Sequence, residues 1–415
     1  MSAIWVWTIA AATLAGVMIR PGKWPEAIWA CLGAVLLVVT GLLPVSGAAS
    51  GVAKGTDVYL FLTGMMLLAE LARREGVFDW LARVAVRAAR GSRTRLFTLV
   101  YLVGMLVTVF LSNDATAVVL TPAVYAAVKK ARVTALPYLF VCAFIANAAS
   151  FVLPIANPAN LVVYGKSLPA LLPWLRLFLL PSILSIGGTY AVLRFLSRRD
   201  LKGDMEPVET AELTGEARRA VWSIAATGVI LLGISSLGLN LGAATFVSAI
   251  GATLLATRAS GGRVREIARG VAWSVLPLVA GLFVLVEALD GVGALQDVGT
   301  VLQRFAHLPP IAASLSGSFA IAALSNLMNN LPSGLLAGGA LRTVQLPGYL
   351  PPAVLIGVDL GPNLSVTGSL ATILWLIALR REGEHVSGWR FLKTGVLVMI
   401  PALFLATLVI PWTAQ

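Results

Sequence analysis

Small clusters of polar side chains interrupt the apolar stretches of this chain, and their residue types could do chemistry. The first cluster is Ser112-Asn113-Asp114, followed by Thr116, in a stretch rich in valine and leucine. Ser, Asn and Asp side chains cap helix N-termini, so one half-helix can end here and another begin. A helix that begins inside an apolar protein presents unpaired N–H groups and a positive dipole end to a ligand. The cluster therefore predicts a ligand site at a break between two half-helices.

Three further clusters carry the same chemistry. Ser325-Asn326 with Asn329-Asn330 and Ser333 resembles the first cluster, and Asn157-Pro158-Ala159-Asn160 pairs with Gly361-Pro362-Asn363. Proline breaks a helix, and the flanking Asn or Gly lets the chain turn. Such amides can also simply join helices, but two pairs at matching positions favour a site around a central cavity. The predicted substrate-binding residues are all amides or hydroxyls: Ser112, Asn113, Thr116, Asn157, Asn160, Ser325, Asn329, Asn330, Ser333, Asn363 and Thr367.

Five acidic residues lie within apolar stretches or at their ends. Asp114 and Asp359 lie inside the interrupted segments and are the first choice for proton carriers, because a medium of low dielectric constant favours the neutral form of a carboxyl. Glu70 and Glu287 lie close to the ends of apolar stretches, where they either take part in proton coupling or pair neighbouring helices. Asp57 is interpreted as a helix N-cap.

Catalytic chemistry has no comparable basis in the sequence. The two cysteines, Cys31 and Cys142, are solitary, and the two histidines, His307 and His385, lie far apart. There is no metal-ligand spacing, Walker A loop or GxSxG motif. We therefore expect no metal, no cofactor and no enzymatic activity.

The elements that position these clusters are predicted to be transmembrane helices. Of 415 residues, 58% are hydrophobic and 12% are charged, whereas soluble proteins carry about 25% charged residues. Most of the surface is therefore expected to contact membrane lipid. The net charge of +12 comes from basic residues in short loops between apolar stretches, which is typical of membrane orientation and not of nucleic-acid binding. No basic segment precedes the first apolar stretch, which we interpret as a span and not as a cleavable signal peptide.

About ten stretches are predicted to span the membrane as helices. They cover residues 3–19, 25–44, 56–72, 96–111, 171–194, 218–236, 240–257, 272–289, 310–324 and 390–412. Four further apolar stretches are interrupted: 112–129, 137–165, 325–339 and 351–380. Irregular backbone at membrane depth is tolerated only inside protein or beside a wet cavity. The predicted fold is an all-α membrane protein with about ten transmembrane helices and discontinuous helices that form a central site.

The chain divides into two halves of opposite orientation. Gly64 is followed six residues later by Glu70, as Gly281 is by Glu287. Residues 73–95 contain seven arginines and two acids, a net charge of +5, whereas the loop after Glu287 has a net charge of −1. Positive loops face the cytoplasm, so these loops lie on opposite sides, as inverted repeats require. We predict a first inverted repeat over 1–196, a cytoplasmic linker over 197–219, a second repeat over 220–415, and both termini on the periplasmic side.

The interrupted segments also restrict the solute. Apart from Lys166 and the terminal Lys129, Lys130 and Arg380, they contain no basic residue. A dianion would need fixed positive charge or several helix N-termini. Asn, Ser and Thr side chains together with two acids suit a neutral polyol-like solute or a small cation, because amides and hydroxyls both donate and accept hydrogen bonds.

Three strings in these segments resemble a known family. SNDATAVVLTP at 112–122, SNLMNNLPSG at 325–334 and IGVDLGPNLSVTGSLATILWLIAL at 356–379 resemble the bacterial arsenite efflux permeases, members of a wider ion-transporter superfamily. The resemblance covers essentially the whole chain. The family's roles carry over onto Asn113, Asp114, Asn329, Asn330 and Asp359. The chain departs from the best-known members at Asn147, where they usually have an acid, at Asn363, where they often have Lys, and in the NPAN string at 157–160.

The resemblance implies efflux of arsenite and antimonite, as neutral trihydroxides, across the bacterial inner membrane in exchange for protons. It also implies a transport part with two helical hairpins beside a scaffold part. Some relatives associate with a cytosolic arsenite-stimulated ATPase, and a homodimer is a further assembly that we consider. The alternative within transport is a sodium–proton or carboxylate exchanger of the same superfamily. Because neither Cys31 nor Cys142 is paired, we expect recognition of the solute by hydrogen bonds and not by thiolates.

Overall fold

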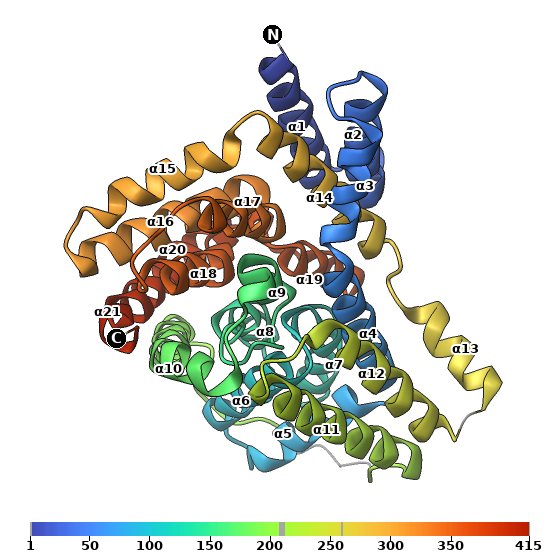
Figure 1. Ribbon diagram of the computed structural model, residues 1–415. Helices are drawn as coiled ribbons and strands as arrows, with labels where there is room; N and C mark the ends of the chain where they lie inside the picture. The colour runs from blue at the N-terminus through green and yellow to red at the C-terminus, as the bar shows by residue number, and fades with distance from the viewer. Residues whose placement is uncertain (1, 207–211, 259, 415) are drawn as a thin grey trace.

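The protein is helical throughout its described residues. The computed structural model describes residues 2–206, 212–258 and 260–414, and every regular element in these ranges is a helix (Figure 1). Their one strand-like feature is an isolated antiparallel bridge between Ser92 and Asp204. A helix satisfies its backbone hydrogen bonds internally, which lipid requires of a spanning segment. The predicted all-α class is confirmed.

Five helices are long and apolar enough to cross a membrane, judged by length and composition among the described residues. They are α6 (Arg93–Phe110), α10 (Leu171–Leu196), α11 (Gly215–Ser236), α16 (Pro310–Met328), and α20 (Gly388–Leu408) extended by α21 (Ile410–Thr413). Two bent pairs also pass: α3 (Val45–Lys54) with α4 (Thr56–Arg74), at 47°, and α13 (Gly261–Gly270) with α14 (Val275–Gly291), at 44°. The chain is therefore a multi-pass membrane protein with up to seven such spans, and the predicted ten remain a prediction.

The other helices are shorter. Four are apolar: α1 (Ser2–Ile19), α2 (Glu26–Val39), α8 (Leu136–Ala148) and α12 (Leu241–Thr257). The rest are α5 (Val77–Ala88), α7 (Thr121–Lys130), α9 (Pro158–Tyr164), α15 (Ala294–Ala306), α17 (Asn330–Thr343), α18 (Leu350–Leu360) and α19 (Leu370–Arg381). Single turns complete the described chain: the π-helical η2 (Ala115–Leu120) and the 3₁₀-helical η1 (Pro21–Lys23), η3 (Gly165–Ser167), η4 (Gly361–Leu364) and η5 (Val366–Gly368).

The predicted interruptions are present, and local residue chemistry explains them. The helix α6 ends just before Ser112-Asn113, and η2 begins after Asp114. Between α16 and α17 the chain turns at Asn329, whose φ of 78° and ψ of 154° lie in a strained region that glycine alone adopts readily. Pro158 opens α9, where its missing N–H costs no helical hydrogen bond. Each of these breaks sets the start of a new helix inside the protein.

Two amphipathic helices follow two long apolar ones in the same way. The helix α5 follows α4 after Gly76, and α15 follows α14 after Gly293, with φ of 70° and 89° at the two glycines. A positive φ costs glycine little and lets the chain change direction sharply. The amphipathic helices α5 and α15 therefore follow their long apolar helices at matching places in the chain.

The interrupted helices lie in the middle of the molecule. In Figure 1, α8 and α9 lie near the centre of the view, between α16, α18 and α20 on one side and α4 and α12 on the other. The helix α9 contacts α4, α17 and α18. Elsewhere α4 packs on α12, α14 on α2 and α3, and α10 on α20. Two glycines permit the closest of these approaches, since Gly64 lies against the Thr245 backbone and Gly281 against that of Ala30.

Candidate functional site

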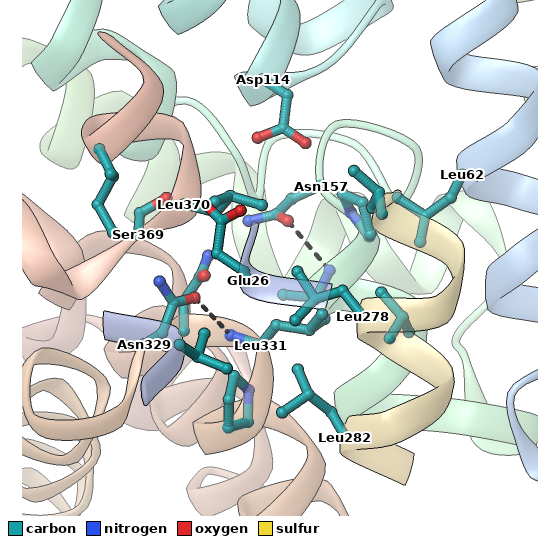
Figure 2. Close-up of a pocket in the computed structure, with 18 of the residues that line it drawn as sticks. Glu26, Leu62, Asp114, Asn157, Leu278, Leu282, Asn329, Leu331, Ser369 and Leu370 are labelled. Atoms are coloured by element: carbon teal, nitrogen blue, oxygen red, sulfur yellow. Dashed lines mark hydrogen bonds between the residues drawn. The ribbon is translucent and has the colours of Figure 1, made fainter. Parts of the chain in front are cut away.

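A pocket lies where four helices begin inside the protein. It contains about 670 Å³ of space when its open side is included. Most of its polar lining is contributed by Asn113 and Asp114 before η2, Asn157 before α9, Asn329 and Asn330 at α17, and Ser369 before α19 (Figure 2). Helix starts that are far apart in the sequence thus meet around one space.

Each helix start at the pocket is capped by a side-chain oxygen. Ser112 Oγ accepts from Ala115 N at 3.1 Å, and Asn157 Oδ1 accepts from Ala159 N at 3.0 Å. Likewise Asn329 Oδ1 accepts from Leu331 N at 3.4 Å, and Ser369 Oγ accepts from Ala371 N at 3.2 Å. Capping of this kind satisfies one of the N–H groups that a helix start leaves free. The four starts also direct four positive dipole ends toward the pocket, which favours electron-rich oxygen atoms in a ligand.

The opposite wall of the pocket is apolar. Leu62 of α4 and Val275, Leu278, Val279 and Leu282 of α14 form most of it. Val17 of α1 completes it. These side chains can neither donate nor accept hydrogen bonds, so they exclude water from that side. Specific recognition must therefore come from the polar wall.

Asp114 presents a carboxyl to this space. Figure 2 shows it directed toward the region that Asn157 and Asn329 border. Its backbone N–H donates to Asn113 Oδ1 at 2.9 Å, while its carboxyl has no hydrogen-bond or ion-pair partner among the described residues. The Asn113 backbone in turn donates to Ala156 O at 3.2 Å, which ties the first break to the second. Asp114 is therefore free to interact with whatever enters the pocket.

Asp359 lies behind the pocket wall and is fully buried. Its Oδ1 accepts from Asn157 Nδ2 at 2.9 Å, whereas its Oδ2 has no partner within the described residues. An unpaired charge in such a place would be very costly. The carboxyl therefore favours its neutral form unless a cation or a donor reaches Oδ2.

A second buried pair of amides joins the two halves of the chain. Asn147 Nδ2 donates to Asn363 Oδ1 at 3.0 Å, and Asn363 Nδ2 donates to Phe144 O at 3.0 Å. Two of the three departures from the arsenite permeases, Asn147 and Asn363, are thus direct partners. The pair leaves one buried acceptor, Asn147 Oδ1, without a hydrogen-bond partner among the described residues.

Seven of the predicted binding residues do not line this pocket, and most of their polar atoms are hydrogen-bonded to neighbouring groups. Asn160 donates to the carbonyls of its own loop, at Ser150, Leu153 and Pro154. Ser325 bonds Ser333, at 2.9 Å. The others are equally occupied: Thr116 by Thr108, Asn363 by Asn147, and Thr367 by Ser365 and the Asn326 carbonyl. These residues stabilise the helix breaks without facing the pocket. Ser112 does the same by capping a helix start through Ala115 N.

Glu70 and Glu287 lie away from the pocket, each in an ion pair. Glu70 accepts from Arg73 and Arg74 at 2.6 to 2.8 Å. Lys54 donates to Glu287 at 2.6 Å. The pair of Lys54 and Glu287 joins α3 to α14, whereas both partners of Glu70 lie in its own helix α4. Proton coupling by either acid stays a prediction. Asp57 also pairs helices, because its Oδ1 accepts from Gly242 N at 3.1 Å and so satisfies the start of α12 and not that of its own helix.

One pocket residue was missed by the sequence analysis. Glu26, at the start of α2, lines the pocket and forms an ion pair with Arg20, across the turn between α1 and α2 (Figure 2). Both side chains are less than one-fifth exposed. A signal was available, because Arg20 and Glu26 flank a Pro-Gly-Lys-Trp-Pro turn between two apolar stretches. In the sequence this turn has the composition of a surface loop. In the fold Glu26 at its end lies at the pocket, together with residues of α14.

The lining chemistry is that of hydrogen bonds and carboxyls. Among the residues that the structure describes, no Lys or Arg side chain lines the pocket. Those residues also contain no group of three His, Cys, Asp or Glu side chains that could hold a metal ion. Neither cysteine lines the pocket, since Cys142 is buried in α8 and Cys31 lies against Pro277 O.

Broken helices that meet at an internal polar pocket, in a multi-pass helical membrane protein, define a membrane transporter. The comparisons with known proteins agree. A family model described as a citrate transporter matches residues 5–358, and the chain belongs to this family.

Several curated relatives are similar over nearly the whole chain. An arsenical pump membrane protein of Yersinia enterocolitica is 28% identical over 401 residues, covering 92% of this chain and 91% of the relative. A protein of the same name from Escherichia coli K12 is 28% identical over 393 residues, covering 90% of each chain. An uncharacterized transporter of Mycobacterium tuberculosis is 25% identical over 364 residues, covering 85% of each. The predicted resemblance to arsenite permeases is confirmed.

A solved structure has a similar fold. The crystal structure of the Alcanivorax borkumensis YdaH transporter, described as having an unusual topology, superposes with a TM-score of 0.58. The match covers 92% of this chain and 96% of that one, at 14% sequence identity. At that identity the likeness concerns the fold.

Proposed function

We propose that the protein is a secondary transporter that exports arsenite and antimonite, as neutral trihydroxides, in exchange for protons. The observation that carries the proposal is the lining of the pocket. Amides, a hydroxyl and two carboxyls face the solute, and no described Lys or Arg side chain does. Citrate and similar polyanions would meet two acids there without a fixed positive charge. The relatives named arsenical pump membrane protein support the same assignment.

A trihydroxide suits the polar wall because each of its hydroxyls both donates and accepts. Asn113, Asn329 and Asn330 can donate to its oxygens, and Asp114 and Glu26 can accept from its O–H groups. Recognition through hydrogen bonds also permits release. Thiolates would bind trivalent arsenic strongly, and the pocket offers none.

Asp114 and Asp359 are the proposed proton carriers. Asp114 faces the solute directly, and Asp359 is linked to it through Asn157 and the backbone contact between Asn113 and Ala156. In the proposed cycle, a carboxyl binds a proton when the pocket opens to the periplasm and releases it when the pocket opens to the cytoplasm. The solute moves the opposite way and carries no charge, so the proton gradient drives its export.

We further propose that residues 1–196 and 220–415 are inverted repeats joined by a linker over 197–219. Two reciprocal contacts support this arrangement. Glu70 of α4 lies against Gly270, at the bend between α13 and α14, and Glu287 of α14 lies against Gly51 and Lys54, at the bend between α3 and α4. A two-fold axis in the membrane plane would exchange these contacts.

The arginine-rich loop at 73–95 supports the proposed orientation. In the proposed orientation the linker lies in the cytoplasm and both termini lie in the periplasm of a bacterial inner membrane, because basic segments favour the cytoplasmic side. The two helical hairpins, a homodimer and an association with a cytosolic arsenite-stimulated ATPase belong to the same proposal.

A second candidate function is exchange of a carboxylate, and two observations favour it. The family model carries the description citrate transporter, and four helix starts direct their positive dipole ends at the pocket. A carboxylate would require Asp114 and Glu26 to be protonated when it binds. Its binding should therefore strengthen steeply as the pH falls.

Everted membrane vesicles distinguish the two functions. We expect accumulation of arsenite that depends on an imposed pH gradient, collapses with a protonophore and is unaffected by replacing sodium with potassium. Labelled citrate should show no such uptake. Citrate transport without arsenite transport would replace the first function with the second, and a sodium requirement would show that sodium and not protons drives transport.

A further inference from the structure

A second pocket lies at the ends of two helices that face lipid. It is lined by Leu136, Pro137 and Phe140 of α8, by Leu193, Leu196, Ser197 and Asp200 at and beyond the end of α10, and by Arg390, Lys393, Thr394 and Leu397 of α20. It holds about 610 Å³ of space, including its opening. We propose that this pocket binds the headgroup of an anionic phospholipid.

The two basic side chains of this pocket have no acidic partner. Among the described residues, neither Arg390 nor Lys393 takes part in an ion pair, although ten such pairs are present elsewhere. Lys393 has one recorded contact, with its Nζ 5.1 Å from the centre of the Trp389 ring. Asp200 also lines the pocket, but it lies within 4 Å of neither cation, so the pair of cations outweighs it.

The position of these cations on α20 adds a second argument. Arg390 and Lys393 lie in the first two turns of α20, near its positive dipole end, where basic residues are electrostatically unfavourable. The start of α8 contributes another positive end at Leu136 and Pro137. An anion held between the two helix starts would relieve both effects. Arg390 provides a planar fork for a phosphate, and Ser197 provides a hydroxyl donor.

The apolar part of the lining selects a lipid over a soluble phosphate. Leu196 and Leu397 are 39% and 52% exposed, and along α20 the exposed Ile400 and Phe404 continue the same apolar surface. Trp389, 64% exposed at the start of α20, suits the boundary between lipid and water. A headgroup in the pocket would therefore leave its acyl chains lying along α20 and α10. Basic pockets between membrane helices recognise anionic headgroups in this way.

The experiment compares lipid binding by matched variants of the full-length protein. Delipidated protein is titrated with phosphatidylglycerol or phosphatidylcholine, and bound lipid is counted by native mass spectrometry. The pocket variant carries Arg390→Gln and Lys393→Gln. The control variant carries Arg218→Gln and Lys202→Gln, which removes the same two charges from exposed positions outside the pocket.

We expect the pocket variant to bind phosphatidylglycerol roughly tenfold or more weakly than the wild type, since each basic residue near an anionic lipid contributes about 1 kcal/mol. The control variant should bind as the wild type does, and phosphatidylcholine should bind weakly to all three proteins. Equal losses in both variants, or no loss in either, would overturn the proposal. Displacement of the lipid by an equal concentration of glycerol 3-phosphate would show that the pocket takes a soluble anion instead.

Discussion

Asn157 donates a hydrogen bond to Asp359 across 202 residues of chain, with Nδ2 and Oδ1 at 2.9 Å. The amide of Asn157 is shared between two tasks, because its oxygen caps α9 at the pocket while its nitrogen holds the buried carboxyl. One side chain thus connects the solute-facing wall to the acid behind it. A change in the protonation of Asp359 can reach the start of α9 through this one residue.

The two roles of Asp359 can be separated by substitution. Asp359→Asn keeps an oxygen that accepts from Asn157 and should preserve the fold while abolishing the dependence of arsenite efflux on the pH gradient. Asp359→Ala removes the acceptor and should also lower the free energy of unfolding by about 1–3 kcal/mol, because the Asn157 donor is left buried and unpaired. Thermal unfolding of the purified proteins and vesicle flux measure the two effects. Unchanged pH dependence in Asp359→Asn would remove Asp359 from the coupling path.

Asp114→Asn tests the carboxyl that faces the solute. We expect the variant to exchange labelled arsenite for unlabelled arsenite across the membrane but to lose uphill efflux driven by a pH gradient, because its side chain can bind the solute but cannot carry a proton. Asp57→Asn is the matched control, since Asp57 lies outside the pocket and its replacement keeps an acceptor for Gly242 N. Uphill efflux by the Asp114→Asn protein at the wild-type rate would contradict the assignment.

The ion pair between Arg20 and Glu26 predicts how the thermal stability of the two single variants compares with that of the double variant. Arg20→Gln leaves the Glu26 carboxyl unpaired at the pocket, and Glu26→Gln leaves Arg20 unpaired in the turn. Removing one partner of a poorly solvated pair costs more than removing both. The double variant should therefore unfold at a higher temperature than at least one single variant. Additive losses in a double-mutant cycle would show that the two side chains do not interact.

Replacement of both cysteines tests recognition through hydrogen bonds. Cys31→Ser with Cys142→Ser should retain arsenite efflux in everted vesicles, because neither thiol lines the pocket. A modest loss of stability is expected at Cys142, whose position is fully buried. Loss of efflux in a double variant that is still folded and inserted would show that a thiol binds the metalloid.

Gly338 tests the packing behind the pocket. A Cβ atom there would lie 2.6 Å from Val163 O of α9, so Gly338→Ala must push α9 away from α17. Overpacking of this kind costs about 1–3 kcal/mol. Because α9 has only seven residues and its start lines the pocket, a shift at Val163 should also weaken arsenite efflux. Gly233→Ala in α11, with no atom within 4 Å of the added Cβ, is the control and should be neutral or slightly stabilising. Equal behaviour of the two variants in thermal unfolding would contradict this packing.

Much of the fold could be predicted because its main signals are local. Proline, asparagine and glycine disrupt helices through their own backbone chemistry, so the breaks at Asn113, Asn157 and Asn329 are visible in the sequence. Apolar length marks the helices that cross the membrane. The count of spans is harder, because α1, α2, α8 and α12 are apolar but short.

The composition of the site was only partly predictable. Five of the predicted residues, Asn113, Asp114, Asn157, Asn329 and Asn330, line the pocket, whereas Asn160 and Asn363 form their hydrogen bonds elsewhere. An asparagine that binds a solute and one that braces a loop have the same appearance in a sequence.

Long-range packing decided the remaining pocket positions. Glu26 reaches the pocket because α2 packs on α14. Leu278 and Leu282 cannot be distinguished by type from leucines that face lipid.

The pocket has a polar wall that can select the solute and an apolar wall that excludes water and ions. The two tasks are therefore carried out by different residues. A solute held by the amides can move past α4 and α14 without exchanging one hydrogen bond for another, since valine and leucine offer none. Substitutions at the helix starts should therefore change which solute is bound. The apolar wall of α4 and α14 should continue to exclude ions in such variants.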